Sequence, residues 1–182
     1  MRASDFLALA FPVEREEEFF SRLKEIAKEH FDASHHCWAF RLRVANLHRF
    51  SDAGEPAGTA GKPILAALER AGLVDSAIVV ARWFGGTKLG TGGLARAYHE
   101  AAAAAIQSSS VVERYLYARY RLAASYAQAG AVYRLVDPPS IIVIGEEFGE
   151  RSELTVDVRS SMSDRFEMLL RERRIDFERM PE

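Results

Sequence analysis

The chain has 182 residues, 48% of them hydrophobic and 27% charged, which is enough apolar material for one large core or two small ones and excludes a disordered chain. Its formal net charge of -2 provides no global positive field to draw the protein onto nucleic acid or an anionic membrane. Any site for a phosphate group must therefore be local.

Cysteine usage and hydropathy indicate a cytoplasmic protein without a membrane partner. The one cysteine, Cys37, excludes an internal disulfide framework and suits a reducing compartment. No stretch approaches the roughly 20 apolar residues that a membrane-spanning helix needs, and the first apolar run is too short for a signal sequence.

In chain order, the first elements are a strand, a helix and a second strand. Residues 6–13 alternate weakly around Pro12, which favours an edge strand. Residues 14–31 have acidic residues in their first turn and apolar residues at helical spacing, so they predict an amphipathic helix. Residues 37–44 alternate apolar and other side chains and predict a half-buried strand.

Two glycine-rich loops follow, each leading into a helix. Residues 46–59 are dense in turn formers and predict a loop, and residues 59–70 predict a helix with Thr59 as its N-cap. The short apolar run 77–84 predicts a buried strand. Residues 85–93 predict the second loop, and the alanine-rich segment 94–107 the second helix.

A serine run at residues 108–110 marks a domain boundary, with domains at 1–112 and 113–182. The pattern then restarts, and we expect Ser163 to be the N-cap of the last helix. The second domain is expected to have the β-α-β-β-α-β order of a ferredoxin-like domain, within an α+β protein of two domains. Its predicted strands are residues 114–124, 140–146, 153–159 and 175–180, and its predicted helices are 126–136 and 163–173.

A local excess of positive charge lies around the second loop. Residues 61–96 hold five basic and two acidic side chains. The starts of the two predicted helices, 59–70 and 94–107, have amide N–H groups without intrahelical acceptors and a partial positive charge, so both suit an anion, and glycines let a phosphate approach the backbone. We expect phosphate or nucleic-acid contacts from Lys62, Arg82, Gly85, Gly86, Lys88, Gly90, Gly92, Gly93 and Arg96.

A purely structural interpretation of these loops stays open. The glycines can serve tight turns and helix–strand packing while the lysines are solvated. Carboxylates in a turn more often bind backbone N–H groups than perform acid–base chemistry. We therefore assign the shape of the first loop to Asp52, Gly54, Glu55, Pro56 and Thr59. Neither loop completes a nucleotide-triphosphate or dinucleotide motif.

A metal centre and a catalytic cysteine are less favoured. His35, His36, Cys37 and His48 match no standard zinc spacing, and neighbouring residues on a strand point to opposite faces. Cys37 lies among bulky neighbours and is expected to be a small buried hydrophobe rather than a thiolate. We expect no metal, no cofactor and no catalytic residue.

Two long segments resemble the paired signature of the YigZ/IMPACT family: residues 51–65 (SDAGEPAGTAGKPIL) and 82–98 (RWFGGTKLGTGGLARAY). Residues 35–40 resemble the segment that precedes them. The resemblance covers residues 1–112, and the remainder is similar in pattern to the family's bacterial C-terminal domain. It implies an N-terminal fold like the second domain of a small-subunit ribosomal protein and a C-terminal domain similar to part of elongation factor G.

The resemblance also implies a link to translation, because eukaryotic relatives regulate initiation under stress by competing for a protein partner of a kinase. Our leading hypothesis is a non-catalytic binding protein for RNA or a ribosome-associated surface. The first alternative is a regulator that binds a protein partner. The second is an enzyme acting on a small phosphorylated or peptide substrate through Asp52, Glu55 and Lys88.

Overall fold

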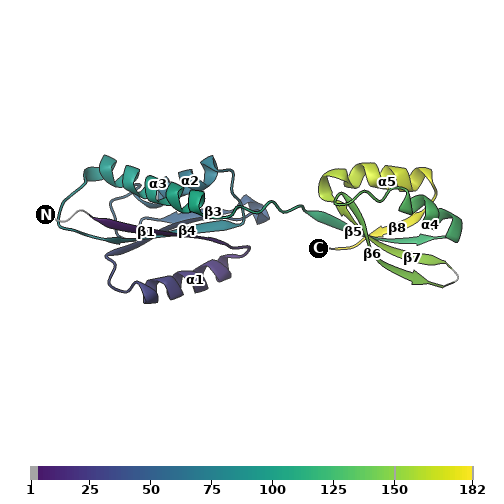
Figure 1. Cartoon of the computed structure of the whole chain (residues 1–182), viewed down its shortest axis with the longest axis horizontal. Helices are drawn as coiled ribbons and strands as arrows, with labels where there is room; N and C mark the ends of the chain where they lie inside the picture. The colour runs from purple at the N-terminus through teal and green to yellow at the C-terminus, as the bar shows by residue number, and fades with distance from the viewer. Residues whose placement is uncertain (1–3, 150, 182) are drawn as a thin grey trace. The chain divides into compact units, whose positions relative to one another are not determined.

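This computed structural model describes residues 4–149 and 151–181. In these residues the strands form two separate four-stranded sheets (Figure 1). The chain divides into two units, Met1–Val111 and Val112–Glu182. The cores of the two units share no residue. The protein is therefore of the α+β class with two domains, as the sequence predicts.

The sheet of the first unit has the strand order β1-β4-β2-β3, and each neighbouring pair is antiparallel. The first strand lies at an edge, as its proline predicts. The elements are β1 (Asp5–Pro12), α1 (Glu16–Glu29), β2 (His35–Arg41), η1 (Val44–Asn46), β3 (His48–Ser51), α2 (Gly61–Arg70), β4 (Ser76–Trp83) and α3 (Gly90–Ser108).

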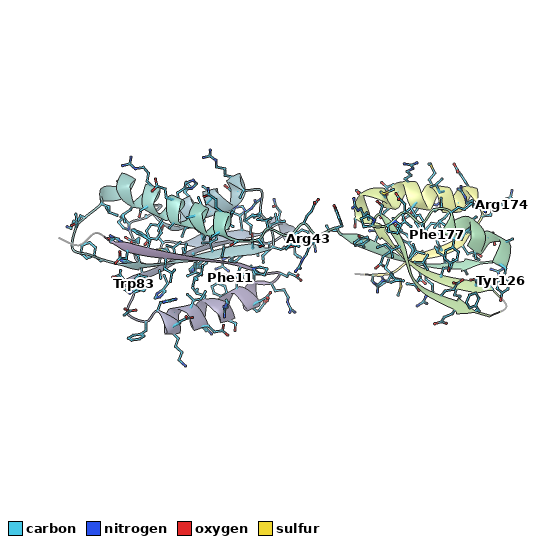
Figure 2. All side chains as sticks on the ribbon, viewed as in Figure 1. Phe11, Arg43, Trp83, Tyr126, Arg174 and Phe177 are labelled. Atoms are coloured by element: carbon cyan, nitrogen blue, oxygen red, sulfur yellow. The ribbon has the colours of Figure 1, made fainter. Side chains whose placement is uncertain are left out.

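Helices cover both faces of this sheet, with α1 on one face and α2 and α3 on the other (Figure 1). Phe11 and Trp83 lie on the α1 side (Figure 2). The prediction of a half-buried strand over residues 37–44 is wrong on this point, because residues 37–40 are all buried. Trp38 and Phe40 pack under α1, whereas Cys37 and Ala39 pack under α2 and α3.

Element boundaries differ from the prediction at both glycine-rich segments. The expected loop 46–59 contains the short strand β3, which pairs with β2. Helix α3 begins at Gly90, four residues before the predicted start at residue 94. Glycine weakens a helix interior, but the first turn of α3 tolerates three glycines, and the apolar residues that follow pack against α2 in one core.

The sheet of the second unit has the order β6-β7-β5-β8 and is antiparallel throughout. Helices α4 and α5 pack on one face (Figure 1), and Phe177 packs against the same core (Figure 2). Its chain order is the predicted β-α-β-β-α-β. The elements are β5 (Tyr117–Ala124), α4 (Tyr126–Tyr133), β6 (Ile141–Phe148), β7 (Ser152–Arg159), η2 (Ser160–Met162), α5 (Ser163–Glu172) and β8 (Asp176–Arg179).

Both predicted N-caps are wrong. Ala60 precedes α2 and Met162 precedes α5, so Thr59 lies one residue too early and Ser163 is already the first residue of its helix. Ser125 is a true N-cap, because it forms a reciprocal capping box with Gln128 at the start of α4. None of the helices in the described residues is long and apolar enough to cross a membrane.

Candidate ligand-binding site at the glycine-rich loops

The carboxylate of Asp52 organises the first glycine-rich loop and the start of α2. Oδ2 accepts the N–H of Gly58 at 2.8 Å, and Oδ1 accepts those of Ala60 and Gly61, both at 2.9 Å. Burial acts to raise the pKa of Asp52, but these three amide hydrogen bonds outweigh it and hold the pKa below its usual value. The side chain thus does for α2 what an N-cap does.

This cap corrects the expectation that both helix starts are open to an anion. At α2 the protein's own carboxylate occupies the amide groups that a phosphate would need. Thr59 plays a different part, since its hydroxyl donates to the carbonyl of Pro56 at 2.7 Å. Gly54 has φ = +90°, a backbone conformation that favours glycine in this turn. Asp52, Gly54 and Thr59 thus make their contacts and turns within the first loop and at the start of α2.

A buried ion pair joins the first loop to the end of β4. Glu55 Oε1 lies 2.6 Å from Arg82 Nη1, and both side chains are almost fully buried. The same oxygen accepts the hydroxyl of Tyr98, a residue of α3, at 2.7 Å. Three segments far apart in the sequence are therefore held by one carboxylate.

Arg82 is consequently not a surface contact for phosphate, and this part of the predicted site is wrong. The residue is only 4% exposed. Its guanidinium also donates to Ser4 Oγ at 3.0 Å and lies against the rings of Phe6 and Phe84, 5.6 and 5.4 Å from their centroids. A charged residue within an otherwise apolar strand is a signal for a buried partner, and it could have suggested this pairing.

Cys37 and His35 border the same cluster. The Cys37 thiol donates to the carbonyl of Asp52 at 2.9 Å, and burial raises its pKa to about 12, so it is no nucleophile at neutral pH. His35 Nδ1 lies 2.9 Å from the carbonyl oxygen of Ala53, and Nε2 lies 4.0 Å from Glu55 Oε1. In residues 4–149 and 151–181, no three His, Cys, Asp or Glu side chains gather as a metal would require.

The start of α3 differs from that of α2 because it is exposed. Leu89 stands at the N-cap position, and within the described part of the chain no side chain caps this helix. Gly90, Thr91 and Gly92 are all exposed in the first turn. The amides of a first helical turn lack intrahelical acceptors, so they face solvent here. The open helix start that the sequence analysis expects at two helices is therefore present at α3 and absent at α2.

Backbone conformation or close packing requires glycine at some, but not all, of the glycine positions around this helix start. Gly86 and Gly90 have φ of +92° and +68°, so their turns favour glycine. Gly93 is packed closely, because a Cβ there would lie 3.1 Å from the Cβ of Leu89. Gly92 has neither constraint: a Cβ would meet no described atom within 4 Å. The structural interpretation therefore explains three of these four glycines.

Lys62, Lys88 and Arg96 are exposed. The packing of α2 against α3 brings Lys62 and Arg96 to the same region of the surface. His99 Nδ1 lies 3.2 Å from the carbonyl oxygen of Pro63, the residue after Lys62. Arg96 is one turn before His99 on α3, so Arg96 and Lys62 border the same contact of α2 with α3. Gly90 is nine residues before His99, about 13 Å along the helix axis. Lys88 is two residues before the start of α3, Arg96 is six residues after it, and Lys62 lies near His99 in the middle of the helix.

The two carboxylates required by an enzymatic alternative have other tasks. Asp52 is bonded to the backbone at α2, and Glu55 is buried against Arg82 and Tyr98. Lys88, in contrast, is exposed on the second loop. We therefore assign no acid–base role to Asp52 or Glu55.

Fold and site together define a two-domain α+β protein. In its first domain, two glycine-rich loops lead into α2 and α3, and a buried ion pair joins the first loop to β4. Residues 2–106 match the family described as the Impact N-terminal domain. The chain therefore belongs to the IMPACT family.

Similar proteins support this membership over most of the chain. An IMPACT family member from Haemophilus influenzae is 37% identical, with 85% of this chain and 75% of the relative covered. YvyE of Bacillus subtilis is 32% identical, covering 90% and 76%, and YigZ of Escherichia coli is 34% identical, covering 75% and 68%. A crystal structure titled only as that of a hypothetical protein matches with a TM-score of 0.65 and 29% identity, covering 100% of this chain and 91% of that one.

Proposed function

We propose that this protein is a non-catalytic binding protein that takes RNA, free or on a ribosome-associated surface, at the start of α3. The observation that carries the proposal is the exposed first turn of α3, which no described side chain caps and which has Lys88 before it and Arg96 within the helix. Backbone N–H groups and the two cationic side chains can bind phosphate oxygens, and the helix dipole favours their negative charge.

The glycine at position 92 supports the same assignment. Neither its φ nor its surroundings require glycine, yet its missing side chain leaves the first turn open to a bulky anion. Arg82 contributes indirectly, since its pair with Glu55 fixes the end of β4 from which the loop departs.

A binding titration with a matched control tests this proposal. Fluorescence anisotropy with a labelled RNA oligonucleotide at low salt should show that the Lys88→Ala/Arg96→Ala variant binds about tenfold or more weakly than the wild type. The control is Lys24→Ala/Lys28→Ala, which removes the same charge from exposed positions of α1 on the other face of the sheet. Equal losses in both variants would show non-specific attraction, and no binding by the wild type would refute the proposal.

A second candidate is a regulator that binds a protein partner through the same loop. Leu89 is 39% exposed beside Lys88, and a branched aliphatic side chain suits a protein surface better than a nucleotide. A pull-down after nuclease treatment separates the two candidates, because a partner bridged by RNA is lost and a direct partner is retained.

The proposal includes a role in translation. It draws on the family resemblance, which implies a likeness of the first unit to a ribosomal protein domain and of the second to part of elongation factor G. Co-sedimentation of the wild type, but not of Lys88→Ala/Arg96→Ala, with ribosomal subunits from a cell extract is the expected result.

A further inference from the structure

An exposed aromatic residue lies directly before the second glycine-rich loop, residues 85–93. Phe84 follows the last residue of β4 and is 49% exposed, although a phenylalanine is commonly buried. Lys88 is four residues further along the same loop. The loop thus presents an apolar ring and a cation within a short stretch of chain.

The position of Phe84 is fixed by contacts of its ring and of its backbone. One side of the residue faces the guanidinium of Arg82, 5.4 Å from the ring centroid, and that guanidinium is fixed by Glu55 and Ser4. The backbone N–H of Phe84 also donates to Ser34 Oγ at 3.2 Å. A ring held in this way loses little conformational freedom when a ligand stacks on it.

We propose that Phe84 is a stacking platform for an unpaired base, so that the ligand of this loop is single-stranded RNA. The inference rests on the proposed function, and it adds the class of nucleic acid. An aromatic ring beside backbone-contacting cations is the combination by which proteins hold single strands. A base within a duplex has both faces covered by its neighbours, so duplex RNA can meet the cations but not the ring.

The test compares two RNA probes and two matched variants of the full chain. The probes are a labelled mixed-sequence single strand of 12 nucleotides and the same strand annealed to its complement. Phe84→Leu keeps an apolar side chain over Arg82 but removes the stacking surface. Phe31→Leu makes the same change at a phenylalanine that is 82% exposed, in the turn after α1. Thermal unfolding of both variants shows whether the fold is kept.

The expected result is a loss of about 5- to 100-fold in single-strand affinity for Phe84→Leu, with wild-type affinity for Phe31→Leu. Duplex affinity should be unchanged by Phe84→Leu, and Phe84→Tyr should restore single-strand binding. If the wild type binds both probes equally and Phe84→Leu has no effect, the stacking inference is overturned while the phosphate site stands. If the wild type binds neither probe, the proposed function itself fails. Loss of both probes in a folded Phe84→Leu protein would mean that the ring shapes the loop rather than stacks.

Discussion

At the scale of single residues, the first unit depends on Glu55. Its carboxylate binds a guanidinium from β4 and a hydroxyl from α3, and all three side chains are buried. A buried charge is costly unless it is paired, so neither partner is dispensable alone. The pair fixes the geometry of three segments.

A double-mutant cycle tests this coupling. Glu55→Gln and Arg82→Met should each lower the free energy of unfolding by about 3 to 5 kcal/mol, because each leaves the other charge buried and unpaired. The double variant should lose clearly less than the sum of the two losses. Urea unfolding followed by circular dichroism measures all four proteins. Additive losses would show that the two groups do not interact.

Asp52 makes stability depend on pH. Its folded-state pKa lies below the unfolded value because of the three amide hydrogen bonds, so its contribution is complete above about pH 4 and is lost as the pH falls through the folded pKa. Asp52→Asn should cost about 2 kcal/mol at pH 7. The difference from wild type should shrink in urea titrations below about pH 4 and would stay constant if the carboxylate charge were irrelevant.

At the scale of elements, the sequence predicts where helices and strands lie, and misses what caps and buries them. The amphipathic pattern of α1 and the proline of β1 are local signals, and both elements were found as expected. The cap of α2 comes from Asp52, eight residues before Ala60, and the partner of Arg82 is 27 residues away. Propensity and spacing along the chain do not identify these partners, although a charged Arg82 in an apolar strand signals that a buried partner exists.

Glycines in α2 and α3 offer a direct contrast between structure and function. Gly92→Ala should raise the free energy of unfolding by about 0.5 to 1 kcal/mol, because alanine suits a helix better and has free space here. The same change should weaken RNA binding by crowding the first turn. Thermal unfolding and anisotropy titrations measure the two effects.

Gly61→Ala is the control for this contrast. A Cβ at position 61 would lie 2.7 Å from the backbone carbon of Ser51, so this variant should be destabilised. A Gly92→Ala protein that is stabilised and binds RNA as the wild type does would remove the glycine from the binding site.

At the scale of the whole molecule, the charges explain why binding must be local. Residues 1–111 contain thirteen basic and thirteen acidic side chains, and residues 112–182 contain eleven and thirteen. Neither unit is a positive body that attracts polyanions at long range. The sequence reveals the local excess near α3, but only the structure removes Arg82 from it. What remains is a small site that a few contacts control.

The salt dependence of RNA binding tests the central claim most directly. For a single strand, the logarithm of the association constant falls with the logarithm of salt concentration by about 0.7 for each phosphate contacted. We predict that the slope for Lys88→Ala/Arg96→Ala is shallower than that of the wild type by about 1.4, for two lost phosphate contacts. The slope for Lys24→Ala/Lys28→Ala should equal the wild-type slope. Identical slopes for the wild type and the α3 variant would contradict the account.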